Sequence, residues 1–134
     1  SPLFAGNDLR IMKSETLNIL TNKEIIAINQ DALGIQGFKY QSENGVDVWV
    51  KPLFYFFWAV VFFNRCDKTQ KINFDWKKHI IEDNDFKFIL NSTSQKYNVR
   101  DLWEHINLGN TNKIFQKELA PHDVIAIKLT KVKK

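Results

Sequence analysis

Carboxylates are the first candidates for chemistry in this chain, because a pair of carboxyl groups can hydrolyse a glycosidic bond. That reaction needs two facing carboxyl groups, one of them a buried acid with a raised pKa. The acidic residues considered for it are Asp8, Asp31, Asp75, Glu82, Asp83, Asp85, Asp101, Glu104 and Asp123. The densest group, residues 82–85, has the composition of a solvated turn. No member is marked as a buried acid, so the residues alone predict no catalytic pair.

Other reactive side chains give no recognisable site either. The histidines His79, His105 and His122 lack metal-ligand spacing with one another or with cysteine, so no metal site and no cofactor is predicted. The single cysteine, Cys66, excludes a disulfide within this chain, and its place after an apolar run favours a structural thiol. No serine lies in a Gly-x-Ser-x-Gly motif.

Two short polar motifs have competing interpretations. Asn7 and Asp8 follow the apolar residues 1–5, as polar residues do at the carboxyl end of a buried parallel strand, where they often face a ligand. They can equally cap the next segment through side-chain hydrogen bonds, which is the commoner use of Asn and Asp. Around Trp103, the charges of residues 100–105 favour a strand end with surface ion pairs over a catalytic group.

The first quarter of the chain carries helix signals and the remainder carries strand signals. Ser14 is an N-cap candidate, residues 21–24 form a capping box, and Gly34 ends the helical pattern. From Phe38 onward the apolar period becomes two. The predicted strands span 38–41, 46–51, 58–63, 72–76, 86–90, 97–102, 114–119 and 124–129. Short strands separated by turns are typical of an antiparallel Greek-key β-sandwich, which we place at residues 35–134, behind a helical part at 1–34.

Composition limits the partners of the chain. Its net charge is +4, but the lysines are scattered and cluster only near the terminus, so no nucleic-acid partner is predicted. The longest apolar run, residues 53–63, is too short to span a bilayer. No signal peptide is visible, and the absence of an initiating Met suggests a fragment of a longer protein. Asn91 begins an Asn-Ser-Thr glycosylation motif.

Six segments together resemble one enzyme family. They are SPLFAGNDLR at residues 1–10, LTNKEIIAINQD at 20–31, LGIQG at 33–37, VWVKPL at 48–53, WAVVFFNR at 58–65 and VRDLWEH at 99–105. Their order and spacing resemble the carboxyl-terminal part of glycoside hydrolase family 27, the melibiase-type α-galactosidases and α-N-acetylgalactosaminidases. The resemblance runs through nearly the whole chain.

The resemblance implies a two-part enzyme with a (β/α)8 barrel followed by an antiparallel β-sandwich. Residues 1–8 would be the last barrel strand, and residues 10–31 the helices that close the barrel. The family removes terminal α-linked galactose, or its N-acetylated relative, with retention, using two aspartates on earlier barrel strands. No aspartate here matches either motif, so we expect no catalytic residue in this chain. The resemblance also implies a secreted or lysosomal protein, and a homodimer is compatible with it.

The aromatic run at residues 53–58 departs from the family, which usually has a small polar turn there. The hairpin can keep its register with exposed rings, the register can differ, or the patch can contact a partner. Such an uncharged, strand-prone run predicts poor soluble expression of the chain alone.

A second hypothesis is a non-catalytic β-sandwich module that binds a carbohydrate or a protein. Aromatic side chains such as Trp49, Tyr55 or Trp103 would then stack on sugar rings. The motifs at residues 7–8 and 28–31 favour the enzyme, because a free-standing module has no need of a barrel-closing helix.

Overall fold

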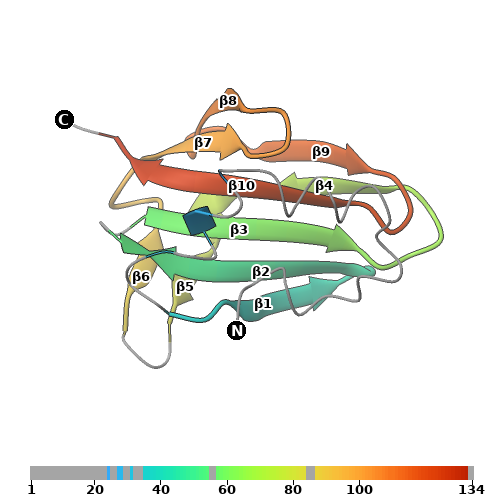
Figure 1. Ribbon diagram of the computed structural model, residues 1–134, viewed down its shortest axis with the longest axis horizontal. Helices are drawn as coiled ribbons and strands as arrows, with labels where there is room; N and C mark the ends of the chain where they lie inside the picture. The colour runs from blue at the N-terminus through green and yellow to red at the C-terminus, as the bar shows by residue number, and fades with distance from the viewer. Residues whose placement is uncertain are drawn as a thin grey trace.

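A computed structural model describes residues 24, 27–28, 31, 35–54, 57–83 and 87–132 of the chain. Ten β-strands and one short 3-10 helix follow one another in this part (Figure 1). They are β1 (Phe38–Glu43), β2 (Val46–Leu53), β3 (Phe57–Asn64), β4 (Gln70–Phe74), η2 (Trp76–Lys78), β5 (Ile80–Glu82), β6 (Ile89–Asn91), β7 (Tyr97–Asp101), β8 (Ile106–Asn110), β9 (Phe115–Leu119) and β10 (Val124–Lys131). Residues 24, 27 and 28 have helical backbone.

The strands form one large antiparallel sheet and two small ones. The large sheet has six strands in the order β1-β2-β3-β10-β7-β8, and the small sheets pair β4 with β9 and β5 with β6. Figure 1 looks onto one face of the large sheet, and the small sheets lie behind it. The antiparallel β-sandwich predicted from the sequence is therefore confirmed. Residues 1–23, to which the last barrel strand and most of the closing helices were assigned, lie outside the described part.

An aromatic core joins the layers. The ring of Phe62 on β3 stacks on Phe115 of β9, with centroids 5.0 Å apart, and meets Phe74 of β4 edge-on at 5.5 Å. Trp76 of η2 also lies edge-on to Phe74, at 4.9 Å. Pairs of this kind stabilise a core by about 0.5–1.5 kcal/mol beyond their buried area. Phe62, Phe74 and Phe115 thus hold the large sheet to the β4–β9 sheet behind it.

A second apolar cluster lies on the other face of the large sheet. Its buried members are Ile28, Leu53, Ala59, Val61, Leu102 and Ala126. Ile28 belongs to the helical segment, whose blue ribbon lies in front of the sheet in Figure 1. Both faces of β3 are therefore covered, as its unbroken apolar sequence predicts.

The β1–β2 hairpin is closed by the predicted Asn-Gly turn. Asn44 has a φ of 53° and Gly45 a φ of 79°, the left-handed conformations that this turn requires. Next to it, Asp47 is buried, and its Oδ1 accepts hydrogen bonds from the Ser42 hydroxyl at 2.6 Å and from Arg65 Nε at 2.9 Å. The charge that alternation places on β2 is thus neutralised by the residue that follows β3.

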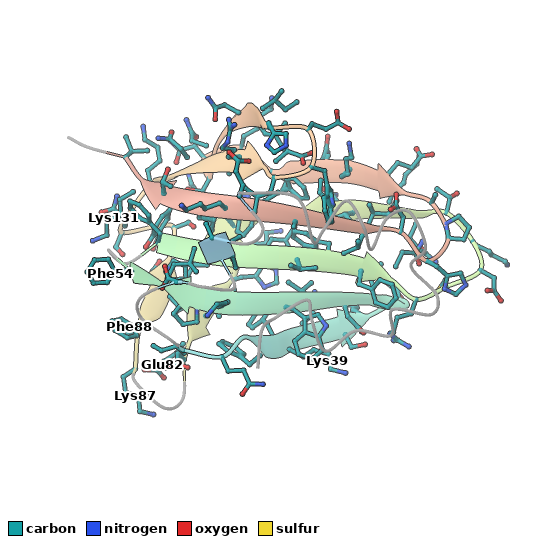
Figure 2. The ribbon with its side chains drawn as sticks, in the orientation of Figure 1. Lys39, Phe54, Glu82, Lys87, Phe88 and Lys131 are labelled. Carbon is teal, nitrogen blue, oxygen red and sulfur yellow. The ribbon has the colours of Figure 1, made fainter. Side chains whose placement is uncertain are left out.

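The β2–β3 hairpin forms in spite of its aromatic connection. Pairing extends to Leu53 opposite Phe57, so residues 54–56 connect the strands and the register holds. The side chain of Phe54 is 47% exposed. Figure 2 shows Phe54 and Phe88 at the same end of the molecule, where Phe57 and Phe88 line a shallow groove. Tyr55 and Phe56 lie outside the described residues.

The observed strands differ from the predicted ones at four places. The two strands β5 and β8 were not predicted. The predicted strand 72–76 ends at Phe74, because Asp75 Oδ1 accepts the N–H of Lys77 and turns the chain into η2. Among the described residues, the predicted strand 86–90 begins only at Ile89.

Candidate functional site

Four described residues that precede the first strand contact the sandwich, and we call them the joint segment: Glu24, Ile28, Asp31 and Ile35. Glu24 makes the longest-range polar contact. Its Oε1 accepts a hydrogen bond from Arg100 Nε at 2.9 Å, and its Oε2 lies 2.7 Å from His105 Nδ1. Burial raises the pKa of Glu24, but the hydrogen bonds and charges of Arg100 and His105 outweigh it and lower the pKa below its usual value. Glu24 therefore contacts the sheet as a carboxylate.

The groups that hold Glu24 are themselves positioned by the end of β7. Arg100 lies on β7 and also donates from Nη1 to Asn107 Oδ1 of β8 at 3.2 Å. His105 closes the turn after β7 with a φ of 58°, which directs the chain back into β8. The sequence predicted that the charges of residues 100–105 pair with one another. Among the described contacts, Arg100 and His105 instead share Glu24, more than seventy residues away.

Lys51 makes the second contact of the joint segment. Its side chain lies on the outer face of β2 and the residue is 5% exposed. The ammonium donates a hydrogen bond to the carbonyl oxygen of Ile35. Burial lowers the pKa of Lys51, and the charge of Asp31 opposes that shift. A buried ammonium is stable only with such partners, so Lys51 fixes the course of the chain just before β1.

Asp31 and Ile28 complete the joint. Asp31 Oδ2 accepts the backbone N–H of Phe54 at 2.8 Å, which ties the segment to the β2–β3 connection. Ile28 is 2% exposed and packs in the second apolar cluster. The joint segment is therefore held at two places on one sheet face: the end of β7, and the end of β2 from Lys51 to Phe54.

Four of the carboxylates considered for chemistry shape turns or loops in the described ranges. Asp101 Oδ1 accepts the N–H groups of Trp103 and Glu104, at 2.8 and 3.1 Å. Asp123 Oδ1 accepts the N–H of Val124 at 2.8 Å, and Asp75 caps η2. Asp83 closes a loop with its backbone groups. Within the described ranges no three His, Cys, Asp or Glu side chains form a cation site. Asp8 and Asp85 lie outside those ranges, as does Asn7.

The tryptophans suggested for sugar stacking have structural contacts. Trp103 donates from Nε1 to the carbonyl of Val124 at 2.9 Å and packs against the second apolar cluster. The ring of Trp49 lies under the Lys39 ammonium, 6.0 Å from it, and packs in the same cluster. Tyr55 is outside the described residues. In the part of the chain that the structure describes, no helix is long and apolar enough to cross a membrane.

Comparison with known proteins identifies the sandwich. Residues 43–129 match the family described as the α-galactosidase C-terminal β-sandwich domain. α-Galactosidase A of Cellvibrio japonicus is 40% identical over 130 residues, which are 97% of this chain and 32% of that enzyme. The chain thus spans about a third of the length of this relative.

Solved structures share the fold. The β-L-arabinopyranosidase of Geobacillus stearothermophilus, a family 27 enzyme, superposes with a TM-score of 0.67 at 26% identity, over 93% of this chain and 26% of that one. α-Galactosidase I of Mortierella vinacea gives 0.68 at 24% identity, over 92% and 30%. The latter shows a common fold alone. Together with the family match, these observations establish that the chain belongs to the α-galactosidase C-terminal β-sandwich family and corresponds to the C-terminal part of glycoside hydrolase family 27 enzymes.

Proposed function

We propose that this chain is the C-terminal part of a retaining glycosidase that removes terminal α-linked galactose or N-acetylgalactosamine. The observation that carries the proposal is the 40% identity to an α-galactosidase over 97% of the chain. The two aspartates that the family uses lie on barrel strands earlier than any segment matched here. The chain by itself is therefore expected to be catalytically silent.

The contribution of this part is to hold the end of the barrel against the sandwich. Three contacts of the joint segment support it: Glu24 with Arg100 and His105, Lys51 with Ile35, and Asp31 with Phe54. We place the boundary between the two parts after residue 34. Asn7 and Asp8 then fix the loop after the last barrel strand, close to the edge where the sugar binds. Such an enzyme acts in a secreted or lysosomal compartment.

The isolated chain tests the assignment. Incubated with a nitrophenyl α-galactoside, it is expected to release no nitrophenol, and calorimetric titration with galactose is expected to show no binding. Hydrolysis by the purified chain would overturn the placement of the catalytic aspartates outside it. Binding of galactose without hydrolysis would favour the sugar-binding module instead.

A further inference from the structure

The β5–β6 hairpin carries apolar side chains on its outward face. Ile80 is 61% exposed and Ile89 is 54% exposed, the two highest values among the large apolar residues that the structure describes. Ile81 and Leu90, which alternate with them, are each 1% exposed and face the core. The β5–β6 sheet therefore packs one face against the core and exposes Ile80 and Ile89 on the other.

Asn91 lies on the same outward face. It is the last residue of β6 and pairs directly opposite Ile80, while Glu82 pairs opposite Ile89. Directly opposite residues of an antiparallel pair project to the same side of the sheet, with Cβ atoms about 4.5–5.5 Å apart. A group attached to the Asn91 side chain would therefore begin next to Ile80 and close to Ile89.

The residues after Asn91 form an exposed turn that presents its amide. Asn91 Oδ1 accepts hydrogen bonds from the backbone N–H of Thr93 at 3.0 Å and from the Thr93 hydroxyl at 2.6 Å. Since Oδ1 and Nδ2 share one planar carbon, Nδ2 points away from this contact. Nδ2 makes no hydrogen bond with the described residues. β6 pairs only with β5 among the described strands, and Asn91 at its end is partly exposed.

Asn91-Ser92-Thr93 is the one Asn-x-Ser/Thr triplet in the sequence. Ser92 is buried, whereas Thr93 is exposed. The side chains of Asn91 and Thr93, which the glycosylation motif requires, therefore lie on the accessible side of the turn. The Ser92 hydroxyl has no hydrogen-bond partner among the described residues. Replacing Ser92 by alanine therefore removes no hydrogen bond among the described residues.

We propose that Asn91 is an N-glycosylation site and that its oligosaccharide covers the Ile80–Ile89 pair. The donor is a lipid-pyrophosphate-linked oligosaccharide. A bond forms from Asn91 Nδ2 to the anomeric carbon of the sugar, the bond from that carbon to the phosphate oxygen breaks, the lipid pyrophosphate leaves with the electron pair, and the amide loses one proton. The glycan then covers apolar surface that is otherwise open to water, which raises solubility. This proposal goes beyond the glycosidase assignment and rests only on the secretory compartment proposed with it.

The site is tested by secreting the chain from eukaryotic cells behind an added signal peptide. Treatment with a peptide N-glycosidase is expected to increase gel mobility and to convert residue 91 to aspartate, detected by peptide mass spectrometry. N91Q and T93A are expected to lose the shift, whereas S92A keeps it because it preserves the motif. Unmodified wild-type chain, in cells that glycosylate a co-expressed secreted control, would overturn the proposal. Bacterially produced N91Q and T93A are expected to melt like wild type; if they do not, the conversion of residue 91 to aspartate in the wild-type chain decides the question.

The covering of the isoleucines has its own readout. Glycosylated chain is expected to bind less of an apolar fluorescent dye than the same chain after removal of the glycan. The double variant I80T/I89T is expected to abolish that difference, while I114T, which alters another exposed isoleucine away from the hairpin, leaves it unchanged. Equal dye fluorescence before and after removal of the glycan would contradict the covering role.

Discussion

The carboxylate of Glu24 lies 2.9 Å from the Nε of Arg100, although 76 residues separate them in the chain. The contact joins the helical segment before the sandwich to a strand near its end. It is partly exposed, with about a third of each side chain accessible. Its value therefore lies in positioning the joint more than in overall stability.

A double-mutant cycle measures this contact. E24Q and R100M are each expected to lower the free energy of unfolding, with a coupling energy of about 0.2–1 kcal/mol, as for other partly exposed pairs. Urea unfolding of the two single variants and the double variant gives the value. E104Q is the control, because Glu104 is exposed and adjacent to His105 in sequence. A coupling energy of zero would mean that the pair does not fasten the joint.

Lys51 is expected to matter more than any exposed lysine. K51M keeps the apolar stem but leaves the Ile35 carbonyl without its donor, which costs about 1–3 kcal/mol for a buried group. K71M changes an exposed lysine of β4 and is expected to stay within about 0.5 kcal/mol of wild type. Chemical denaturation of both variants compares them. Equal stabilities would show that the buried ammonium is replaceable by packing.

The stability of the sandwich is expected to fall at acid pH because of His79. Its Nδ1 lies 2.8 Å from the Tyr40 hydroxyl, and its ring stacks on Phe74 at 4.1 Å. Burial lowers the pKa of His79 below its ordinary value of 6.5. The charge of Lys78 lowers this pKa further, while the charges of Asp75 and Glu43 oppose the shift. The unfolded chain therefore binds the proton first as the pH falls. Stability is fully present above pH 6.5 and declines below it until the folded pKa is passed.

The control for this effect is another histidine. H79F is expected to remove this part of the pH dependence of the unfolding free energy between about pH 7 and 5. H122N is expected to retain it, because His122 is exposed and its partner Asp67 lies at the surface. A pH profile of H79F that parallels wild type would assign the acid sensitivity to other groups.

Gly45 is expected to tolerate no side chain. It has a φ of 79°, and a Cβ built on it would lie 1.9 Å from Cys66 Sγ. Gly109, with a φ of 97°, has open space at the same position. G109A therefore reports the cost of the backbone conformation alone, about 1–3 kcal/mol, and G45A is expected to cost more. Adding C66A to G45A should recover the difference; if thermal melts show no recovery, the thiol is not the obstacle.

Sequence patterns predicted strands and turns best where a single local signal was strong. The unbroken apolar run of β3 and the Asn44-Gly45 turn before β2 were confirmed in place and type. β5 was missed because three residues are too few to establish a period. β8 was missed because Gly109 and its polar neighbours resemble a turn, while the strand is held by pairing with β7.

The contacts of the joint segment could not be predicted, because local sequence does not show which residues cover the outer face of the large sheet. Alternation on β2 predicted the strand but not that Lys51 is buried against Ile35. Glu24 was predicted only as a member of a capping box, and nothing local pointed to Arg100. Asp101 was given no catalytic role in advance, since its sequence context carried no sign of a buried acid, and the structure shows its carboxylate accepting backbone N–H groups in a turn.

Grafting measures the central claim most directly. The C-terminal part of Cellvibrio japonicus α-galactosidase A, to which this chain is 40% identical, is replaced by this chain, and hydrolysis of a nitrophenyl α-galactoside is measured. We predict an active, cooperatively melting hybrid, and a lower melting temperature when E24Q and K51M are introduced together. A folded hybrid without activity, or one whose melting ignores both substitutions, would contradict the assignment of this chain as the sandwich that holds the barrel.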